Sequence, residues 1–339
     1  MAEQGEARVT PERIQQFAWG YVPPFVIEAA IQNRVFDVLN EGPKTVEQVQ
    51  AATGASARGL RAIMNVLVAL ELLKKDAGGA YALTPESATF LVTAKPGFLG
   101  GMIKHTSSQL VPRWLHLSEV VKTGDPVAPV NQETTGGEFF HQFVEDILPL
   151  SYPAAQVLAQ TLALGEKGGP VSVLDLAAGS GVWGIALAQS SNQVRVTAVD
   201  WPEVLPVTRK ITARFGVGGQ FNYLAGDLES ADFGTGHVVA TLGHILHSEG
   251  EGRSRKLLKR VFNALAPRGT IAIAEFLVDE GRRGPVAGLF FAVNMLVNTD
   301  VGDTYTFGEV SAWLKEAGFT DVRTVPAPGP SPLILASKP

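Results

Sequence analysis

Three glycines and a carboxylate in the second half of the chain have the spacing of a nucleoside-binding site. Gly179, Gly181 and Gly184 follow the apolar run VSVLDL, and Asp200 ends the next apolar run, QVRVTAVD. Glycines let the backbone approach a ligand closely at a strand-to-helix turn, and a carboxylate after the next strand can hold both hydroxyls of a ribose. The pattern predicts a cofactor with a nucleoside part, which is common to NAD and S-adenosylmethionine.

Other features favour S-adenosylmethionine over NAD. Asp175 ends the strand before the glycine loop, where a carboxylate suits a positively charged sulfonium group and would repel a pyrophosphate. Asp227 follows the third strand candidate, where it can accept a hydrogen bond from the adenine amino group, with Leu228 against the ring. The glycine motif also begins only after about half the chain, whereas dinucleotide-binding folds commonly open with it. An NAD-dependent oxidoreductase remains the alternative.

The elements that must position these residues alternate between strands and helices. Strands are expected at VSVLDL, QVRVTAVD, FNYLAGDL, HVVATLGHIL and TIAIAEFLVD, with helices at VWGIALAQS and WPEVLPVTRKITARFG. This alternation predicts a parallel, doubly wound sheet. The last run, DVRTVPAPGPSPLILASKP, predicts an antiparallel strand pair joined by a Pro/Gly loop. Residues 166–339 are therefore expected to form an α/β, Rossmann-like domain with an antiparallel C-terminal pair.

Residues 1–95 predict a separate, mainly α-helical module. Apolar residues recur at helical spacing over 11–40, where Pro23 and Pro24 should divide two helices. The stretch 45–84 predicts helix, turn, helix and a short hairpin, the order of a winged helix. Its second helix, 57–70, carries few basic residues, so we expect dimerisation, with DNA binding as the alternative. Residues 96–165 are expected to be a mostly helical connector, with loops over 123–137, that contributes to a substrate pocket.

The motifs VLDLAAGSG, TAVDWPEV, AGDL, HILH and LAPRGTIAIAEF resemble, in order and spacing, class I small-molecule O-methyltransferases of the plant caffeate and bacterial polyketide type. With the winged-helix module in front, the resemblance covers nearly the whole chain. It implies a homodimer that uses S-adenosylmethionine and releases S-adenosylhomocysteine. In the cofactor site it implies that Gly179 and Gly181 line the methionine part, Asp200 holds the ribose, and Trp201 flanks the adenine that Asp227 and Leu228 read. Ordinary packing is the alternative for Trp201.

The resemblance also implies a catalytic pair. His247 stands where the family carries its catalytic histidine, and a neutral imidazole with an ordinary pKa of about 6.5 can take the proton of a phenolic or enolic hydroxyl. Glu275 resembles the glutamate that orients this histidine. The alternatives are a helix-capping role for His247 and a structural ion pair for Glu275.

The chain departs from the plant pattern at three places around the histidine. The residues after His247 are Ser248 and Glu249 instead of Asp and Trp, and Thr304 stands where a second glutamate flanks the histidine. The usual lysine four residues before the base is Gly243, so His244 is expected to take its place near the cofactor carboxylate. His244 and His247 follow a strand instead of sharing one helix face, and no HExxH spacing occurs, so no metal is expected.

Aromatic residues in two segments predict an apolar, aromatic acceptor. The resemblance places over the acceptor site a set of apolar and amide side chains: Phe139, Phe140, Phe143, Phe290, Phe291, Asn294 and Met295. Asn294 would be a polar handle for the substrate. The alternative for the phenylalanines is a place in the core or in a dimer interface.

Composition bounds the remaining possibilities. The 339 residues predict two domains, and 45% hydrophobic with 18% charged residues is typical of a packed globular protein. A formal net charge of -5 disfavours nucleic-acid binding, and the lack of about 18 consecutive apolar residues disfavours a membrane span. There is no cysteine, and the first residues lack a signal peptide's pattern, so we expect a cytoplasmic protein. A winged-helix regulator that senses S-adenosylmethionine is the non-enzymatic alternative.

Overall fold

A computed structural model describes residues 9–166, 168–329 and 331–339 of the chain. It divides into two compact units, with the boundary between Leu110 and Val111. The boundary lies inside the segment 96–165 that we expected to be a connector. No helix in the described ranges is long and apolar enough to cross a membrane.

The first unit is mainly helical and contains the expected order of helix, turn, helix and hairpin. Both prolines of the N-terminal region lie in the first turn of α2, where a missing backbone N–H costs no helical hydrogen bond. Thr45 caps α4 in a capping box with Gln48. The elements are α1 Glu12–Ala18, α2 Val22–Gln32, α3 Val35–Leu39, α4 Val46–Thr53, α5 Ala57–Ala69, β1 Leu73–Lys75, β2 Tyr81–Leu83, α6 Pro85–Phe90, α7 Gly100–His105 and the π-helix η1 Thr106–Leu110.

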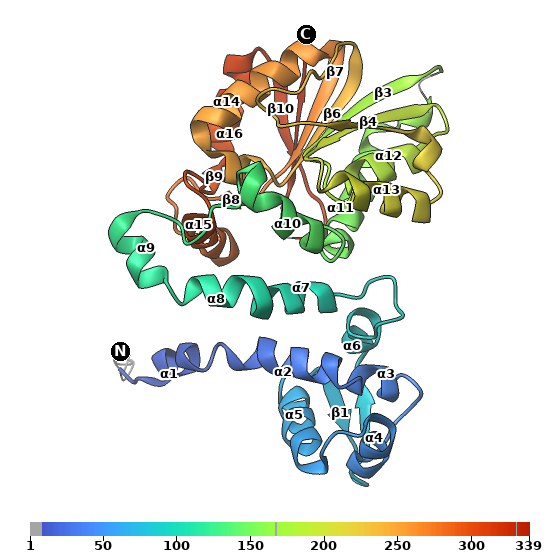
Figure 1. Ribbon diagram of the computed structural model, residues 1–339, viewed down its shortest axis with the longest axis vertical. Coiled ribbons are helices and arrows are strands. Elements are labelled where there is room, and N and C mark those ends of the chain that lie inside the picture. Colours follow the sequence, from blue (N-terminus) through green and yellow to red (C-terminus); the bar gives the residue numbers. More distant parts are fainter. Residues whose placement is uncertain (1–8, 167, 330) are drawn as a thin grey trace, which may run out of the picture. The chain divides into compact units, whose positions relative to one another are not determined.

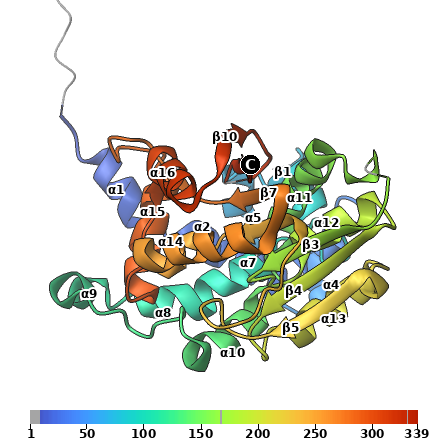
Figure 2. The same ribbon diagram turned by 90° about the horizontal axis from the view of Figure 1, so that it is seen from above.

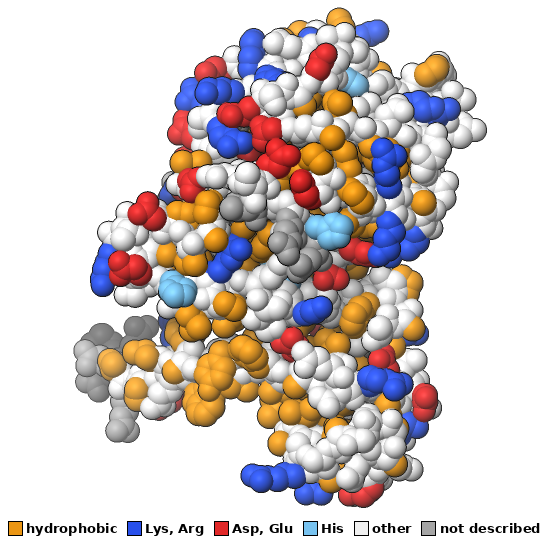
Figure 3. Space-filling view, viewed as in Figure 1, with side chains coloured by type: hydrophobic (Ala, Val, Ile, Leu, Met, Phe, Trp, Pro, Cys, Tyr) orange, Lys and Arg blue, Asp and Glu red, His pale blue; other side chains and the backbone are white. Residues whose placement is uncertain are grey.

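Large apolar side chains on α1 and the start of α2 remain exposed. Helix α1 buries none of its residues. Figure 3 shows hydrophobic side chains gathered over these two helices. We call this set the N-terminal apolar patch; its members are Ile14, Phe17, Trp19, Tyr21 and Phe25. A soluble chain seldom leaves so many neighbouring aromatic residues in water without a partner.

The second unit is built on a seven-stranded sheet with the order β10-β11-β7-β6-β3-β4-β5. The five strands from β7 to β5 are parallel, and β11 runs antiparallel to both of its neighbours. The doubly wound sheet and its antiparallel C-terminal pair are therefore confirmed. The strands are β3 Val171–Leu176, β4 Val194–Asp200, β5 Phe221–Ala225, β6 His237–Gly243, β7 Leu265–Ala274, β10 Thr320–Val325 and β11 Leu333–Ser337, with a separate pair of β8 Leu277–Val278 and β9 Tyr305–Thr306.

Helices cover both faces of this sheet, as Figures 1 and 2 show. Helices α11, α12 and α13 pack on one face, and α14 and α16 pack on the other, each over its own hydrophobic core. The helices are α8 Val111–Trp114, α9 Leu117–Thr123, α10 Glu133–Phe143, α11 Leu148–Leu162, α12 Val182–Ser190, α13 Leu205–Arg214, α14 Leu246–Ala264, α15 Val286–Asn298 and α16 Phe307–Ala317, with short 3-10 turns η2 Leu164–Glu166 and η3 Gly218–Gln220.

The expectation of loops over 123–137 in the connector is right for residues 124–132 and wrong for residues 133–137. Helix α10 begins at Glu133 and includes Gly136. A Cβ atom at position 136 would lie 2.1 Å from the Val130 carbonyl oxygen and 2.6 Å from the Trp201 ring. The glycine therefore permits a close approach of this helix to Trp201. A glycine that usually predicts a turn is needed here inside a helix.

Strands β3 and β6 lie side by side at the centre of the sheet. The chain adds β4 and β5 on one side of β3 and then β6 and β7 on the other, so the direction of winding reverses between β3 and β6. In open α/β sheets, ligands bind beyond the carboxyl ends of the strands at this point. The predicted residues after β3, β4, β5, β6 and β7 all lie at that edge. The fold therefore brings five separate sequence segments to one place.

Candidate active site

The glycine loop between β3 and α12 is held by two neighbouring elements. Gly179 and Gly181 have φ angles of +54° and +76°, which only glycine adopts without strain. The Gly179 amide donates to Asp200 Oδ2 at 2.7 Å, and the Thr208 hydroxyl on α13 donates to the Gly179 carbonyl at 2.7 Å. The loop is therefore fixed in shape, with residues of β4 and α13 as its supports.

Asp200 retains capacity to bind a ligand while it supports this loop. Its two carboxylate oxygens accept one backbone N–H each, from Gly179 and from Trp201 at 2.8 Å, which leaves further lone pairs. The side chain is only partly buried. Burial raises the pKa of Asp200 to about 6, against the opposing effect of the two N–H groups, so the carboxylate is ionised at neutral pH.

Asp175 has a different place from the one expected. Its side chain has no exposed surface, and its oxygens accept the Gly184 amide at 3.0 Å and the Thr241 hydroxyl at 2.6 Å. Burial raises the pKa of this carboxyl to about 7. The geometry therefore does not support contact with a cofactor, and the reasoning that Asp175 would repel a pyrophosphate loses its basis. Its hydrogen bonds instead tie the start of α12 to β3 and β6.

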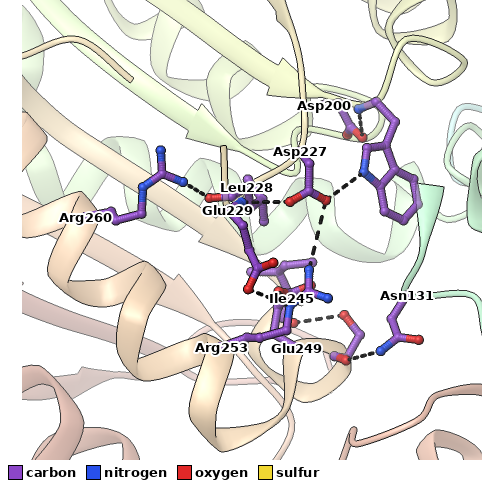
Figure 4. A network of polar contacts seen from close by, with 11 residues as sticks. Asn131, Asp200, Asp227, Leu228, Glu229, Ile245, Glu249, Arg253 and Arg260 are labelled. Carbon is purple, nitrogen blue, oxygen red and sulfur yellow. Dashed lines mark hydrogen bonds and ion pairs between the residues drawn. The ribbon is translucent and has the colours of Figure 1, made fainter. Parts of the chain in front are cut away.

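Asp227 and Trp201 form a polar edge at the carboxyl ends of β5 and β4. Figure 4 shows Asp227 and the contacts that its carboxylate makes. The Trp201 indole N–H donates to Asp227 Oδ2 at 3.3 Å, and the Glu229 amide donates to Asp227 Oδ1 at 2.7 Å. Leu228 is buried directly after this aspartate. Asp200 at the end of β4 and Asp227 after the neighbouring strand β5 thus offer acceptors along one edge of the sheet.

A second polar group behind Asp227 was not predicted from the sequence. Arg253 Nε lies 2.8 Å from a carboxylate oxygen of buried Glu249, and an Arg253 nitrogen lies 4.0 Å from Asp227 Oδ2. Burial raises the pKa of Glu249, against the effect of Arg253. Arg253 therefore connects the aspartate after β5 to the first turns of α14, the helix that contains the candidate histidine. An i, i+4 Glu–Arg pair in the sequence was the signal that could have identified it.

His247 and Glu275 come together across the ends of β6 and β7. Oε1 of Glu275 lies 2.7 Å from the imidazole Nδ1, and Oε2 accepts the His247 backbone amide at 3.2 Å. Glu275 is fully buried and His247 nearly so. Burial opposes ionisation of Glu275, but the charge and hydrogen bond of His247 outweigh it and hold the pKa of this carboxyl below its ordinary value. The geometry leaves the other ring nitrogen, Nε2, to form a hydrogen bond with a group outside the chain.

Thr304 lies close to this pair and supplies no second carboxylate. Its side chain is fully buried, and its hydroxyl oxygen has no hydrogen-bond partner within the described ranges. The adjacent Asp303 amide donates to the His247 carbonyl at 2.9 Å. One glutamate, not two, therefore holds the imidazole.

His244 is a neutral ring at the end of β6. Its Nε2 lies 2.9 Å from the Ser331 hydroxyl, and its backbone has a φ of +60°, an unusual conformation for a residue with a side chain. Burial lowers the pKa of His244 to about 4. An uncharged imidazole cannot replace the charge of a lysine.

Phe291 forms an apolar wall directly beside His247. The Phe291 ring centroid lies 4.7 Å from the imidazole in an edge-on arrangement, and it stacks on Phe276 at 3.9 Å. Phe290, which we expected in the same cluster, is 66% exposed and points elsewhere. Successive side chains of a helix point about 100° apart, so only one of the two faces the histidine.

Asn294 belongs to a polar network that the sequence did not reveal. Its side-chain oxygen accepts the Trp114 indole N–H at 3.0 Å and the Asn298 amide at 3.1 Å. Asn298 in turn accepts a hydrogen bond from Arg113 at 2.8 Å. With its oxygen occupied twice, the Asn294 side chain is oriented so that its NH₂ group is the part left for a ligand.

The phenylalanines of α10 lie between this network and Trp201. The Arg113 guanidinium is 5.0 Å from the Phe139 ring centroid, and Phe140 is 6.0 Å from the Trp201 centroid. Phe143 packs against Phe139 at 5.8 Å. Met295 on α15 is buried. The structure therefore brings the segment 139–143 and the segment 291–295 to the same end of the sheet. Among the described residues, no group of three His, Cys, Asp or Glu side chains is placed to hold a metal ion.

Comparison with known proteins gives matches over both units. Residues 15–93 match the model of the O-methyltransferase dimerisation domain, and residues 155–320 match that of the O-methyltransferase domain. The chain is 30% identical to 3-hydroxy-5-methyl-1-naphthoate 3-O-methyltransferase of Streptomyces sahachiroi over 97% of this chain and 95% of that protein. It is 28% identical to the tetracenomycin polyketide synthesis 8-O-methyl transferase of Streptomyces glaucescens, over 97% of each chain. The crystal structure of human N-acetylserotonin methyltransferase in complex with S-adenosylmethionine superposes with a TM-score of 0.84 and 26% identity, over 99% of each chain.

Proposed function

Because this chain belongs to the O-methyltransferase family, we propose that it transfers the methyl group of S-adenosylmethionine to a hydroxyl of a small aromatic or polyketide-like molecule. The observation that carries the proposal is the 2.7 Å pair of His247 and Glu275, which lies beside Phe291 and at the same sheet edge as the glycine loop. The pair supplies a base, and the loop supplies the nucleoside site. Relatives named for naphthoate and polyketide substrates support the class of acceptor.

The residues at the sheet edge fit S-adenosylmethionine. Asp200 offers carboxylate lone pairs for the ribose hydroxyls, Asp227 offers an acceptor for the adenine amino group, and Trp201 lies between them. Gly179 and Gly181 keep the loop free of side chains beside the methionine part. When bound, the cofactor supplies an electrophilic methyl group on a positively charged sulfur. An NAD-dependent reaction has no comparable support, since the relatives are methyltransferases.

His247 acts as the general base in this proposal. Nε2 of its ring removes the proton of the acceptor hydroxyl as the hydroxyl oxygen attacks the methyl group that is transferred. The ring becomes positively charged. Glu275 stabilises that charge through Nδ1 and fixes the ring orientation. Its burial among apolar strands strengthens the interaction, because little water screens the two charges.

The aromatic side chains position the acceptor. Phe291 holds the face of the molecule beside His247, and Phe139 and Phe143 enclose it from α10. Met295, buried on the same helix as Phe291, adds apolar surface. The NH₂ group of Asn294 donates to a carbonyl or hydroxyl on the acceptor. Alignment of the hydroxyl with the methyl group then supplies much of the rate enhancement.

The protein acts as a homodimer. The match of residues 15–93 to a dimerisation domain and the exposed N-terminal apolar patch support this assembly. Two copies of the patch can cover each other around a two-fold axis.

Calorimetric titration of the purified protein with S-adenosylhomocysteine and, separately, NADH tests the cofactor class. We expect saturable binding of S-adenosylhomocysteine alone, followed by methyl transfer to hydroxylated naphthoates in a mass-spectrometric screen. Binding of NADH alone would contradict the proposal. Tight binding of S-adenosylhomocysteine without turnover of any hydroxylated aromatic would instead favour a regulator that senses the cofactor.

A further inference from the structure

Trp183 presents an indole N–H without a partner beside the glycine loop. It lies in the first turn of α12, two residues after Gly181, and is 5% exposed. Its Nε1 donates to no residue in the part of the chain that the structure describes, yet that atom is not sealed from solvent. A buried indole N–H ordinarily has an acceptor. This group therefore points to an acceptor that is not part of the chain.

The direction of the N–H follows from its contact with Gly243 at the end of β6. A Cβ atom built on Gly243 would lie 1.8 Å from Trp183 Nε1 and 2.5 Å from its Cδ1. The edge of the indole that carries the hydrogen therefore lies over the backbone of position 243. Any side chain at this position would displace it. Because β6 pairs with β3, the N–H stands where the sheet reverses its winding.

The strand order decides which part of the cofactor meets this N–H. Asp200 ends β4 and Asp227 follows β5, so the ribose and adenine extend from the loop toward that side. The amino-acid part of the cofactor must then extend the other way, from β3 toward β6. Its carboxylate is an anion that requires a donor once it leaves water.

On the basis of the proposed function, we propose that the Trp183 indole N–H donates a hydrogen bond to the carboxylate of the cofactor's amino-acid part. This assigns to Trp183 the place that we expected of His244. The imidazole of His244 lies 6.3 Å from the indole ring and already has the Ser331 hydroxyl on Nε2. Of these two side chains, the indole is the one that still has an N–H to donate.

The test is calorimetric titration of wild type and Trp183→Phe with two ligands. S-adenosylhomocysteine contains the amino-acid carboxylate, and 5′-methylthioadenosine lacks the whole amino-acid part. Phe keeps an aromatic ring in the core and removes the N–H, and because its ring is also smaller than an indole, the comparison of the two ligands separates the hydrogen bond from packing. We expect Trp183→Phe to weaken S-adenosylhomocysteine about 10- to 100-fold, the usual value for a hydrogen bond to a charged group, and to change 5′-methylthioadenosine less than 2-fold. His244→Ala is the matched comparison, with an expected change below about 3-fold.

Equal binding of S-adenosylhomocysteine by wild type and Trp183→Phe would overturn the assignment, as would an equal loss for both ligands, which indicates a packing role. Failure of the wild type to bind either ligand would refute the proposed function and this assignment together. If Trp183→Phe does not fold, a second measurement, made on the wild type, still tests the proposal. In a ¹⁵N spectrum, S-adenosylhomocysteine should shift one indole N–H resonance that 5′-methylthioadenosine leaves in place, and the resonance should remain in variants of the other four tryptophans. Identical shifts with both ligands would reject the hydrogen bond.

Discussion

Nδ1 of His247 and Oε1 of Glu275 lie 2.7 Å apart, and the glutamate side chain has no exposed surface. A second oxygen of the same carboxylate accepts the His247 backbone amide. One carboxylate therefore holds both the ring and the backbone of His247, and the neighbouring Thr304 adds no second carboxylate. The orientation of the His247 ring therefore depends on this one carboxylate.

Replacement of Glu275 by Gln should reduce turnover by about 10²-fold, because the neutral amide cannot stabilise the imidazolium that forms on proton transfer. His247→Ala should cause a loss of about 10²-fold or more. The dissociation constant of S-adenosylhomocysteine should stay within about 3-fold of wild type in both variants. Single-turnover kinetics measure the first effect and calorimetry the second. Unchanged turnover in His247→Ala would remove this histidine from the mechanism.

Asp200→Ala should weaken S-adenosylhomocysteine by 10-fold or more, since each hydrogen bond to a charged group contributes about 1.5–3 kcal/mol. The same carboxylate supports the loop through Gly179, so a loss of affinity alone does not identify the ribose contact. The 3′-deoxy analogue separates the two effects. The wild type should bind this analogue more weakly than it binds S-adenosylhomocysteine. The Asp200→Ala variant should bind the two ligands equally well. An undiminished preference for the parent ligand in Asp200→Ala would exclude the contact.

Phe291→Ala should reduce kcat/KM for the acceptor at least 10-fold, because the ring beside His247 defines one wall of the proposed pocket. Phe290→Ala is a control on the same helix, since that side chain is 66% exposed, and should change kcat/KM less than 2-fold. Steady-state kinetics with any accepted hydroxynaphthoate measures both. A larger loss for position 290 than for 291 would contradict the proposed orientation of α15.

Asp175 should make the protein less stable as the pH rises. The pKa of this carboxyl is about 7 in the folded chain and 3.8 ordinarily, so the folded state binds the proton more tightly. The stability that this provides is fully present below pH 3.8 and is lost as the pH rises through about 7. Asp175→Asn should be free of this dependence. Between pH 5 and 8, the wild type should lose roughly 2 kcal/mol more free energy of unfolding than the variant, measured by urea denaturation. Parallel pH dependence of the two proteins would show that the carboxyl titrates normally.

Trp19→Asp in the N-terminal apolar patch should convert the dimer to a monomer, because it puts a charge into the surface that the two copies would bury. Light scattering coupled to size-exclusion chromatography gives the mass directly, with Arg58→Asp on α5 as a charged control. A dimeric Trp19→Asp protein would place the interface elsewhere.

Local sequence determined the strands, the glycine loop and the ends of the strands at which Asp200, Asp227, His247 and Glu275 stand. A buried strand, a glycine turn and a helix are each recognised from neighbouring residues, and parallel strands bring their carboxyl ends to one edge whatever packs around them. The same local pattern predicted two helices in this region, but the break lies at residues 19–21 and Pro23 and Pro24 stand in the first turn of the second helix.

Only the tertiary structure decided where individual side chains point. Asp175 has the type and place of a ligand-binding residue, yet Thr241 on a strand 66 residues later occupies its oxygen and closes it off. Whether Phe290 or Phe291 faces His247 depends on how α15 is rotated against α8. A hydrogen bond from Trp114 on α8 to Asn294 on α15, residues 180 positions apart in the sequence, helps to fix that rotation. Such contacts join segments that are distant along the chain. Residue type and local spacing therefore identified the edge of the sheet, and long-range packing selected which groups at that edge are open to a ligand.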